Sequence, residues 1–256
     1  MSYGPAPVVR AARSGLERNA GFAVLGAAIA VAAAACGGGS STPDAPPDTP
    51  PDMVVSGCGA DLLFTGEIVD WDSVGDCGVA NATVTVRGQP AQTDASNFNG
   101  RFEVCVPQQG QTTVDVTQSA DASRCAQFAG AYPVRGVFIA DPAVIAINAQ
   151  SFSARAMTQA RQNMMFTQIG PTYDAAKAQL VVHVAGTPRA VAISPLHAES
   201  QSYDGTKWAK GSTGAYVFFP NVDPGSATIT VTGGAVGPTS ATLEAGAYTY
   251  VTVIAN

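Results

Sequence analysis

Two histidines, His183 and His197, are the side chains of this sequence best suited to general-base catalysis or zinc binding. A zinc peptidase needs paired histidines with a nearby carboxylate, and neither histidine stands in an H-E-x-x-H or H-x-x-E pattern. A serine hydrolase of the nucleophile-elbow type needs G-x-S-x-G, which the sequence lacks. We therefore predict that the protein is not an enzyme and uses no metal or cofactor. His183, among alternating apolar residues, is expected to face solvent or a sheet edge, and His197 to lie in a polar loop.

Three aspartates, Asp70, Asp72 and Asp76, are close enough in sequence to suggest a calcium loop, because hard cations prefer clustered carboxylates. An EF-hand loop needs an oxygen ligand at its fifth position and a bidentate glutamate at its twelfth. This sequence has Val74 and Asn81 there. We interpret the segment as a solvated loop between strands.

Aromatic residues are concentrated late in the sequence, where they could stack on sugar rings or contact a partner protein. If residues 216–219 form a strand, its alternate side chains point to opposite faces and some of them belong to the core. Tyr203 and Trp208 are therefore the candidate ligand-binding residues. The aromatic residues of this stretch are Tyr203, Trp208, Tyr216, Phe218 and Phe219.

Four cysteines, Cys58, Cys77, Cys105 and Cys125, lie in the first half of the sequence. In an exported chain, four cysteines most simply form two disulfides, and three pairings are possible. Pairing of neighbours predicts Cys58 with Cys77 and Cys105 with Cys125. A zinc site is disfavoured because the cysteines show no short C-x-x-C spacing and no histidine lies among them.

The elements that must position these residues are mostly strands. Val, Thr, Gly, Ala and Pro are abundant, and short alternating apolar runs are separated by turn residues. One exception is the stretch around 151–166, where Phe152, Ala156, Met157, Ala160 and Met164 have helical spacing and predict an amphipathic helix closed by Gly170 and Pro171. The predicted strands cover residues 62–70, 82–87, 101–106, 112–117, 134–139, 179–184, 189–193, 216–219, 227–232 and 248–254.

The first 35 residues have the composition of an export signal. Arg10, Arg13 and Arg18 precede an apolar stretch that ends in alanines immediately before Cys36. This arrangement resembles a bacterial lipoprotein signal, although that family usually has leucine where this sequence has Ala33. The resemblance implies cleavage before Cys36, acylation of Cys36 and, because Gly37 follows, delivery to the outer membrane on its periplasmic or cell-surface side. An uncleaved membrane helix or ordinary secretion are the alternatives.

Residues 36–52 alternate proline with aspartate and are predicted to form a disordered tether, because they have too little apolar surface for a core. Removing residues 1–35 leaves 10 basic and 18 acidic residues, so the mature chain has a net charge of −8. An acidic surface repels nucleic acid, which we exclude as a partner. The expected partners are the membrane, through the lipid anchor, and an envelope glycan or protein.

Several segments carry a family resemblance. The first is a G-E-I-V-D strand at residues 66–70, and the second is a strand preceded by glycine at residues 78–84. Residues 93–102 contain the turn Asn99-Gly100-Arg101-Phe102, and a Val-Pro pair at residues 106–107 ends the strand that follows. Their order is similar to that of the carboxypeptidase regulatory-like domain, a transthyretin-like β-sandwich. The resemblance implies that residues 53–125 form such a sandwich.

A related pattern, Phe219 to Gly225 followed by a valine-rich strand, implies a second sandwich in residues 179–256, with residues 126–178 as connector. The predicted fold class is thus all-β. It comprises two transthyretin-like (prealbumin-like) β-sandwiches in tandem and one short connecting helix, after a signal peptide and a disordered stalk. The family's domain is a non-catalytic companion of enzymes, so the resemblance implies a membrane-anchored lipoprotein that acts as a binding or scaffold module. A carbohydrate-binding module that uses Tyr203 and Trp208 is the alternative function.

Overall fold

The computed structural model describes residues 57–71, 78–117, 135–147, 152–203 and 207–256. The chain divides into two units, residues 1–49 and 50–256, and every described residue belongs to the second. The predicted signal, Cys36, the tether and most of the acidic loop lie outside the described residues, as do Cys77 and Cys125. No helix among the described residues has the length and apolarity needed to cross a membrane.

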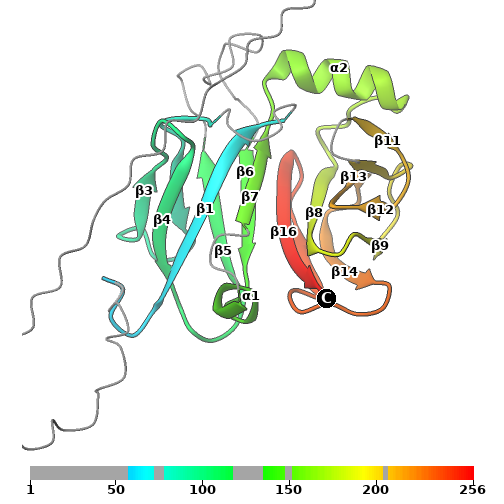
Figure 1. The fold of residues 1–256 in the computed structure, drawn as a ribbon. Coiled ribbons are helices and arrows are strands. Elements are labelled where there is room, and N and C mark those ends of the chain that lie inside the picture. Colours follow the sequence, from blue (N-terminus) through cyan, green and yellow to red (C-terminus); the bar gives the residue numbers. More distant parts are fainter. Residues whose placement is uncertain (1–56, 72–77, 118–134, 148–151, 204–206) are drawn as a thin grey trace, which may run out of the picture. The chain divides into compact units, whose positions relative to one another are not determined.

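A nine-stranded sheet forms the middle layer of the described unit (Figure 1). The strand nearest the C-terminus, β16 (Ala247–Ala255), lies at the centre of this sheet and runs parallel to both of its neighbours. Strands from both halves of the chain therefore share one sheet. In spatial order the strands are β11 (Trp208–Lys210), β10 (Gln201–Tyr203), β13 (Tyr216–Val222), β8 (Ala178–Gly186), β16 (Ala247–Ala255), β6 (Arg135–Ala140), β5 (Thr112–Thr117), β2 (Thr83–Val86) and β3 (Thr93–Ala95).

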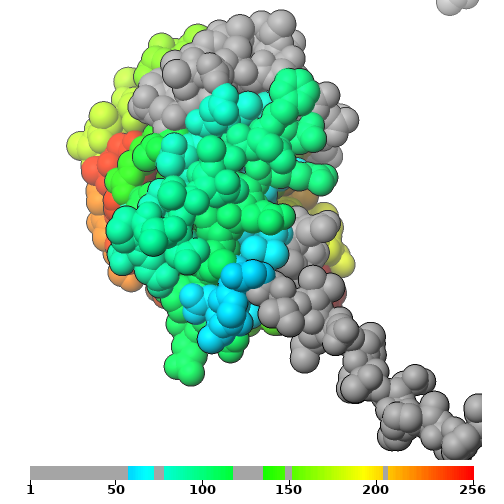
Figure 2. Space-filling view, turned by 90° about the vertical axis from the view of Figure 1, so that its left-hand side faces the viewer, coloured from blue at the N-terminus to red at the C-terminus, as the bar shows by residue number. Residues whose placement is uncertain are grey.

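Two smaller sheets cover opposite faces of the large one. The three-stranded sheet has the order β4 (Arg101–Val106), β1 (Leu62–Asp70) and β7 (Phe152–Ala156). The four-stranded sheet has the order β12 (Thr213–Gly214), β9 (Arg189–Ser194), β14 (Gly225–Val231) and β15 (Ser240–Leu243). Cyan and green residues of β1 to β5 cover the middle of the face turned toward the reader in Figure 2.

The alternation of side chains along β16 explains the three layers. Tyr248 and Tyr250 belong to the core shared with the three-stranded sheet, whereas Val251 and Val253 belong to the core on the other face. Because successive side chains of a strand point to opposite faces, a strand covered on both sides is buried along its whole length, as all nine residues of β16 are. Seven of the nine are apolar or tyrosine, and the other two are Thr249 and Thr252. The described unit is thus mostly β, and the predicted all-β class is confirmed.

The helical prediction for residues 151–166 is partly wrong. Residues Phe152–Ala156 form strand β7, and helix α2 occupies Gln159–Ile169, with Thr158 as its N-cap and Gly170 as its C-cap. The spacing of apolar residues led to a wrong prediction here. A strand buried on both faces, followed directly by a helix, places apolar residues at the same intervals as a single helix does. The buried face of α2 contains Met165 and Phe166, and Met164 is about half exposed. A second helix, α1 (Pro142–Ile147), was not predicted.

Among the described residues, a disulfide joins Cys58 to Cys105, with a Cα–Cα distance of 5.4 Å. The predicted pairing of Cys58 with Cys77 and of Cys105 with Cys125 is therefore wrong. Antiparallel pairing of β1 with β4 places Leu63 opposite Cys105, and a turn closed by the Asp61 N–H and the Cys58 carbonyl brings Cys58 back to the same place. Strand register, not proximity in sequence, selects the partner.

Candidate functional site

Two of the segments singled out in the sequence meet on adjacent strands. In the antiparallel pair of β1 and β4, Gly66 lies opposite Phe102 and Glu67 lies opposite Arg101. Gly66 is needed because a Cβ there would lie 2.6 Å from the Phe102 ring and 2.9 Å from the Phe152 carbonyl oxygen. The glycine of the first segment thus makes room for the aromatic ring of the second.

The turn before β4 is held by close backbone packing. Gly100 has a φ of +77°, and a Cβ on it would lie 2.1 Å from the Ile68 carbonyl oxygen. The Asn97 side-chain oxygen accepts hydrogen bonds from the N–H groups of Asn99 and Arg101 at 2.9 and 3.1 Å. These contacts fix the position at which β4 starts and, with it, the positions of the side chains on its outer face.

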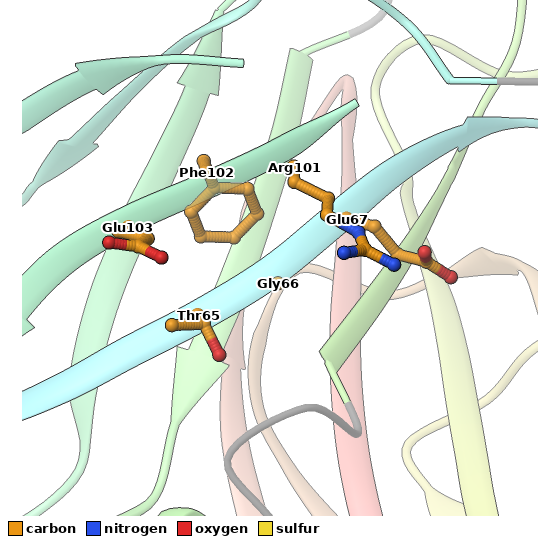
Figure 3. A pocket seen from close by; sticks show the side chains of 6 residues that line it. All are labelled: Thr65, Gly66, Glu67, Arg101, Phe102 and Glu103. Atoms are coloured by element: carbon orange, nitrogen blue, oxygen red, sulfur yellow. The ribbon is translucent and has the colours of Figure 1, made fainter. Parts of the chain in front are cut away.

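A shallow groove lies on the outer face of these two strands (Figure 3). Its volume is about 220 Å³, and its floor is formed at Gly66 and Phe102. Thr65 lies opposite Glu103, and Glu67 opposite Arg101, so these four side chains stand at the corners of the groove. Arg101 and Glu103 are exposed, while Thr65 and Glu67 are half-buried. The lining is Thr65, Gly66, Glu67, Arg101, Phe102 and Glu103.

The charges around the groove are not neutralised by other described residues. Glu67, Arg101 and Glu103 form no ion pair within the described part of the chain. Two carboxylates and one guanidinium leave a net charge of about −1. The groove can therefore bind a ligand that presents a cationic group together with a hydrogen-bond acceptor, and its side chains are held on a paired sheet.

Tyr203 and Trp208, the predicted ligand-binding residues, lie opposite each other on β10 and β11. The same register continues across the sheet to Tyr216 on β13 and His183 on β8. We call Trp208, Tyr203, Tyr216 and His183 the aromatic row. The ring of His183 stacks on that of Tyr216, with a centroid distance of 4.5 Å. Only the strand register brings these four residues together, so no sequence signal marks the row.

The aromatic row is covered rather than open. Trp71, fully buried, stacks on Trp208 with a centroid distance of 4.9 Å and an interplanar angle of 20°. The guanidinium carbon of Arg155 lies 4.7 Å from the centroid of the Tyr216 ring and 5.4 Å from that of Tyr203. Tyr203 is only 5% exposed and Trp208 is half-buried. The row therefore does not present the exposed aromatic faces that the sequence interpretation assumed.

Three polar atoms of this region are buried and have no hydrogen-bond partner among the described residues. They are the indole nitrogens of Trp71 and Trp208 and the hydroxyl of Tyr203. A buried donor without an acceptor costs about 1 to 3 kcal/mol of folding free energy. Three such atoms on touching rings are an unusual concentration in a folded protein.

The two histidines do not form a common site. His183 is half-buried on β8, inside the nine-stranded sheet, so it does not lie at a sheet edge, which was one of the two positions expected for it. His197 packs edge-on against Phe219, which belongs to the core on the opposite face from Tyr216. Among the described residues, no group of three or more His, Cys, Asp and Glu side chains is arranged to hold a metal ion. Asp70 is 1% exposed at the end of β1 and is not solvated as predicted.

An ion-pair network that the sequence analysis missed joins the large sheet to the connection between β15 and β16. Arg87 and Arg135 each bind both Asp115 and Glu244, at 2.5 to 2.6 Å. The hydrogen bond from Arg87, together with that from Arg135, lowers the pKa of Asp115. Partial burial by itself raises the pKa of Glu244, but hydrogen bonds from Arg87 and Arg135 outweigh it and the net pKa is lowered.

No known family model matches this sequence, and no curated protein matches it significantly. Among solved structures, the chain is similar to the shaft pilin SpaA of Lactobacillus rhamnosus GG, at 8% identity over 77% of this chain and 98% of that chain, with a TM-score of 0.24. It is also similar to the TIE protein of Bacillus anthracis, at 12% identity over 77% of this chain and 34% of that chain, with a TM-score of 0.23. A streptococcal ancillary pilin gives 10% identity over 76% and 68%, with a TM-score of 0.21. Scores this low carry no conclusion about function.

Proposed function

We propose that this chain is an exported, membrane-anchored lipoprotein that acts as a non-enzymatic binding or scaffold module, and that the groove over β1 and β4 contacts its partner. The supporting observation is the groove itself, whose floor is formed at Gly66 and Phe102 and whose corners are Thr65, Glu67, Arg101 and Glu103. Carboxylates and a guanidinium on a rigid sheet can select a charged partner without moving.

The chemistry of the groove favours a basic side chain on an envelope protein as the group bound. The diagonal carboxylates of Glu67 and Glu103 complement a cation, and Arg101 can donate to a carbonyl oxygen of the same segment. The volume of about 220 Å³ suits one side chain rather than a large ligand. A net charge of −8 on the mature chain also attracts a basic partner.

Photo-crosslinking from position 65 in intact cells tests the groove. A specific crosslinked protein is expected with the wild-type groove, and it should be lost when Glu67→Gln and Glu103→Gln are combined. Glu199→Gln, an exposed carboxylate outside the groove, is the matched control and should leave the crosslink unchanged. The same crosslink at full yield in the double variant would exclude the groove as the binding surface.

The anchor has a separate test. Cys36 is the proposed acylation site, so labelled palmitate is expected to enter the wild-type protein and to be absent from Cys36→Ala. The variant should also be released from the membrane fraction, because it has lost its only proposed lipid anchor. Undiminished labelling of Cys36→Ala would show that the chain is not acylated there.

The alternative function, a carbohydrate-binding module that uses Tyr203 and Trp208, has weaker support. Stacking on a sugar needs an open aromatic face. Trp71 covers one face of Trp208, and Tyr203 is buried.

A further inference from the structure

The second half of strand β14 has a neighbouring strand on one side only. Residues Thr228–Val231 pair with β9, whereas β15 pairs with Gly225–Thr228. After β14 the chain turns at Gly233 and Gly234, which both have a φ of +82°. It then crosses to β16, with which Val236 exchanges two backbone hydrogen bonds. The connection between β14 and β15 (residues 232–239) therefore bends away from β14 and leaves an opening beside it.

The open side of β14 presents one backbone acceptor and one backbone donor. The Thr232 N–H donates to a carbonyl of β9, so the alternation along the strand turns the backbone groups of Ile229 and Val231 to the other side. There the Ile229 N–H donates to the Thr239 carbonyl at 2.8 Å, and the Val231 carbonyl accepts from the Gly234 N–H at 3.0 Å. The Ile229 carbonyl and the Val231 N–H have no hydrogen-bond partner within the described part of the chain.

Ile229 and Val231 line a pocket of about 330 Å³ between β14 and the connection. The other apolar side chains of the pocket include Val253, which is 2% exposed, and Ala235, which is half-buried. Both pack in or against the core between the large sheet and the four-stranded sheet. The pocket thus combines an apolar floor with an unpaired strand edge, and its volume suits one small side chain and the backbone that carries it.

A peptide backbone supplies both groups that the edge of β14 requires. In a segment that runs parallel to β14, the N–H of one residue donates to the Ile229 carbonyl, and the carbonyl of the same residue accepts from the Val231 N–H. A ligand with a single donor or acceptor would leave one of the two groups unpaired. Addition of a strand to an open edge gains affinity from main-chain hydrogen bonds and specificity from side-chain pockets.

We propose that the second half of β14 binds an extended peptide segment of a partner protein, and that one small apolar side chain of this segment occupies the pocket over Val253. This site goes beyond the proposed function. It belongs to the four-stranded sheet, whereas the groove over β1 and β4 belongs to the three-stranded sheet on the opposite face of the large one. Either site can therefore fail without the other.

Nuclear magnetic resonance of the ¹⁵N-labelled mature full-length protein tests the site. The probe is the peptide acetyl-Ser-Thr-Val-Thr-Ser-amide, and its matched control carries N-methylvaline, which cannot donate to the Ile229 carbonyl. The unmodified peptide is expected to shift the Val231 amide signal saturably and to slow its hydrogen exchange. The methylated peptide should bind at least about fivefold more weakly, as the loss of one hydrogen bond predicts.

Two variants locate the binding on the protein. Ala235→Leu fills the pocket and should weaken binding of the unmodified peptide, whereas Ala245→Leu, at an exposed position outside the pocket, is the control and should leave binding unchanged. Val231→Pro removes the unpaired N–H and should bind at least about fivefold more weakly. This variant should still fold, because proline is tolerated at an open strand edge.

Four results would overturn the proposal. The first is the absence of any shift at Val231, and the second is equal affinity for the methylated peptide. The third is a shift confined to Arg101 and Glu103, which would place the peptide in the groove over β1 and β4. The fourth is protection of the Val231 amide that rises with protein concentration when no peptide is present, which would make a second copy of this chain the occupant.

Discussion

At the scale of single residues, Gly66 is a position where the core leaves no room for a side chain. A Cβ would lie 2.6 Å from the ring of Phe102, which is itself packed against Phe64 and Phe138 and cannot move aside. Gly66→Ala is therefore expected to lower the free energy of unfolding by about 1 to 3 kcal/mol, as overpacking of a core does. Chemical denaturation measures the loss.

Gly57→Ala is the control for this prediction, because nothing lies within 4 Å of a Cβ at Gly57. Adding Phe102→Leu to Gly66→Ala should restore part of the lost stability if the clash with the ring is the cause. A wild-type stability for Gly66→Ala would contradict the close packing of β1 against Phe102.

Trp208 is expected to matter for stability and not only for binding. Its ring stacks on Trp71 and contacts Tyr203 and Phe218. Trp208→Ala should lower the free energy of unfolding by about 2 kcal/mol or more, somewhat less than for a fully buried tryptophan, because the side chain is half-buried. A melting curve identical to that of the wild type would show that the stack contributes nothing to stability.

At the scale of elements, the start of α2 depends on one hydroxyl. The Thr158 side chain accepts the N–H of Arg161 at 3.1 Å. Thr158→Ala removes this N-cap and is expected to lower the free energy of unfolding by about 1 kcal/mol. Thr158→Ser keeps a hydroxyl and should retain most of the stability that the cap provides. The measurement is chemical denaturation, with the exposed helix residue Thr167 changed to Ala as the control. Equal losses in Thr158→Ala and Thr167→Ala would argue against a specific cap.

The prediction of elements succeeded where local pattern decides. Strands β1, β4 and β5 have the predicted bounds, because each is an alternating run closed by turn residues. The prediction failed for β7, because the apolar residues in this strand have the spacing expected for the first turns of a helix. Their strand conformation depends on parallel pairing with β1, which is distant in sequence.

At the scale of the whole molecule, the network of Arg87, Asp115, Arg135 and Glu244 predicts a pH dependence of stability. The pKa values of Asp115 and Glu244 are lowered in the folded protein, so the network stabilises the fold above the ordinary pKa of a carboxyl group and loses its effect as the pH falls. Because the arginines are about 40% exposed, solvent and salt screen the pairs, and the contribution at neutral pH is expected to be about 1 kcal/mol or less.

Denaturation of the wild type and of Glu244→Gln at neutral and acidic pH checks this expectation. The wild type should be the more stable at neutral pH and low salt, and the difference should shrink as the pH falls below about 4. High salt should shrink it as well. A difference that is independent of pH would mean that Glu244 acts through packing rather than through its charge.

The candidate sites show the same division between local and long-range information. The sequence alone identified the segments that contain Gly66-Glu67 and Arg101-Phe102 as noteworthy. It did not show that these four residues meet in one groove. It also identified Tyr203 and Trp208. It gave no indication of Arg155 or Trp71 beside Trp208. These neighbours come from strands that are far apart along the chain, and no local pattern encodes which strands become adjacent.

By itself, the sequence determined the all-β class and the positions of most strands, because alternation and turn residues act over a few neighbours. Only the tertiary structure decided the partner of Cys58, the insertion of β16 between β6 and β8, and the groove over β1 and β4. The physical reason is that each depends on the register and order of strands distant in the chain, which are selected when two cores are buried on opposite faces of one sheet.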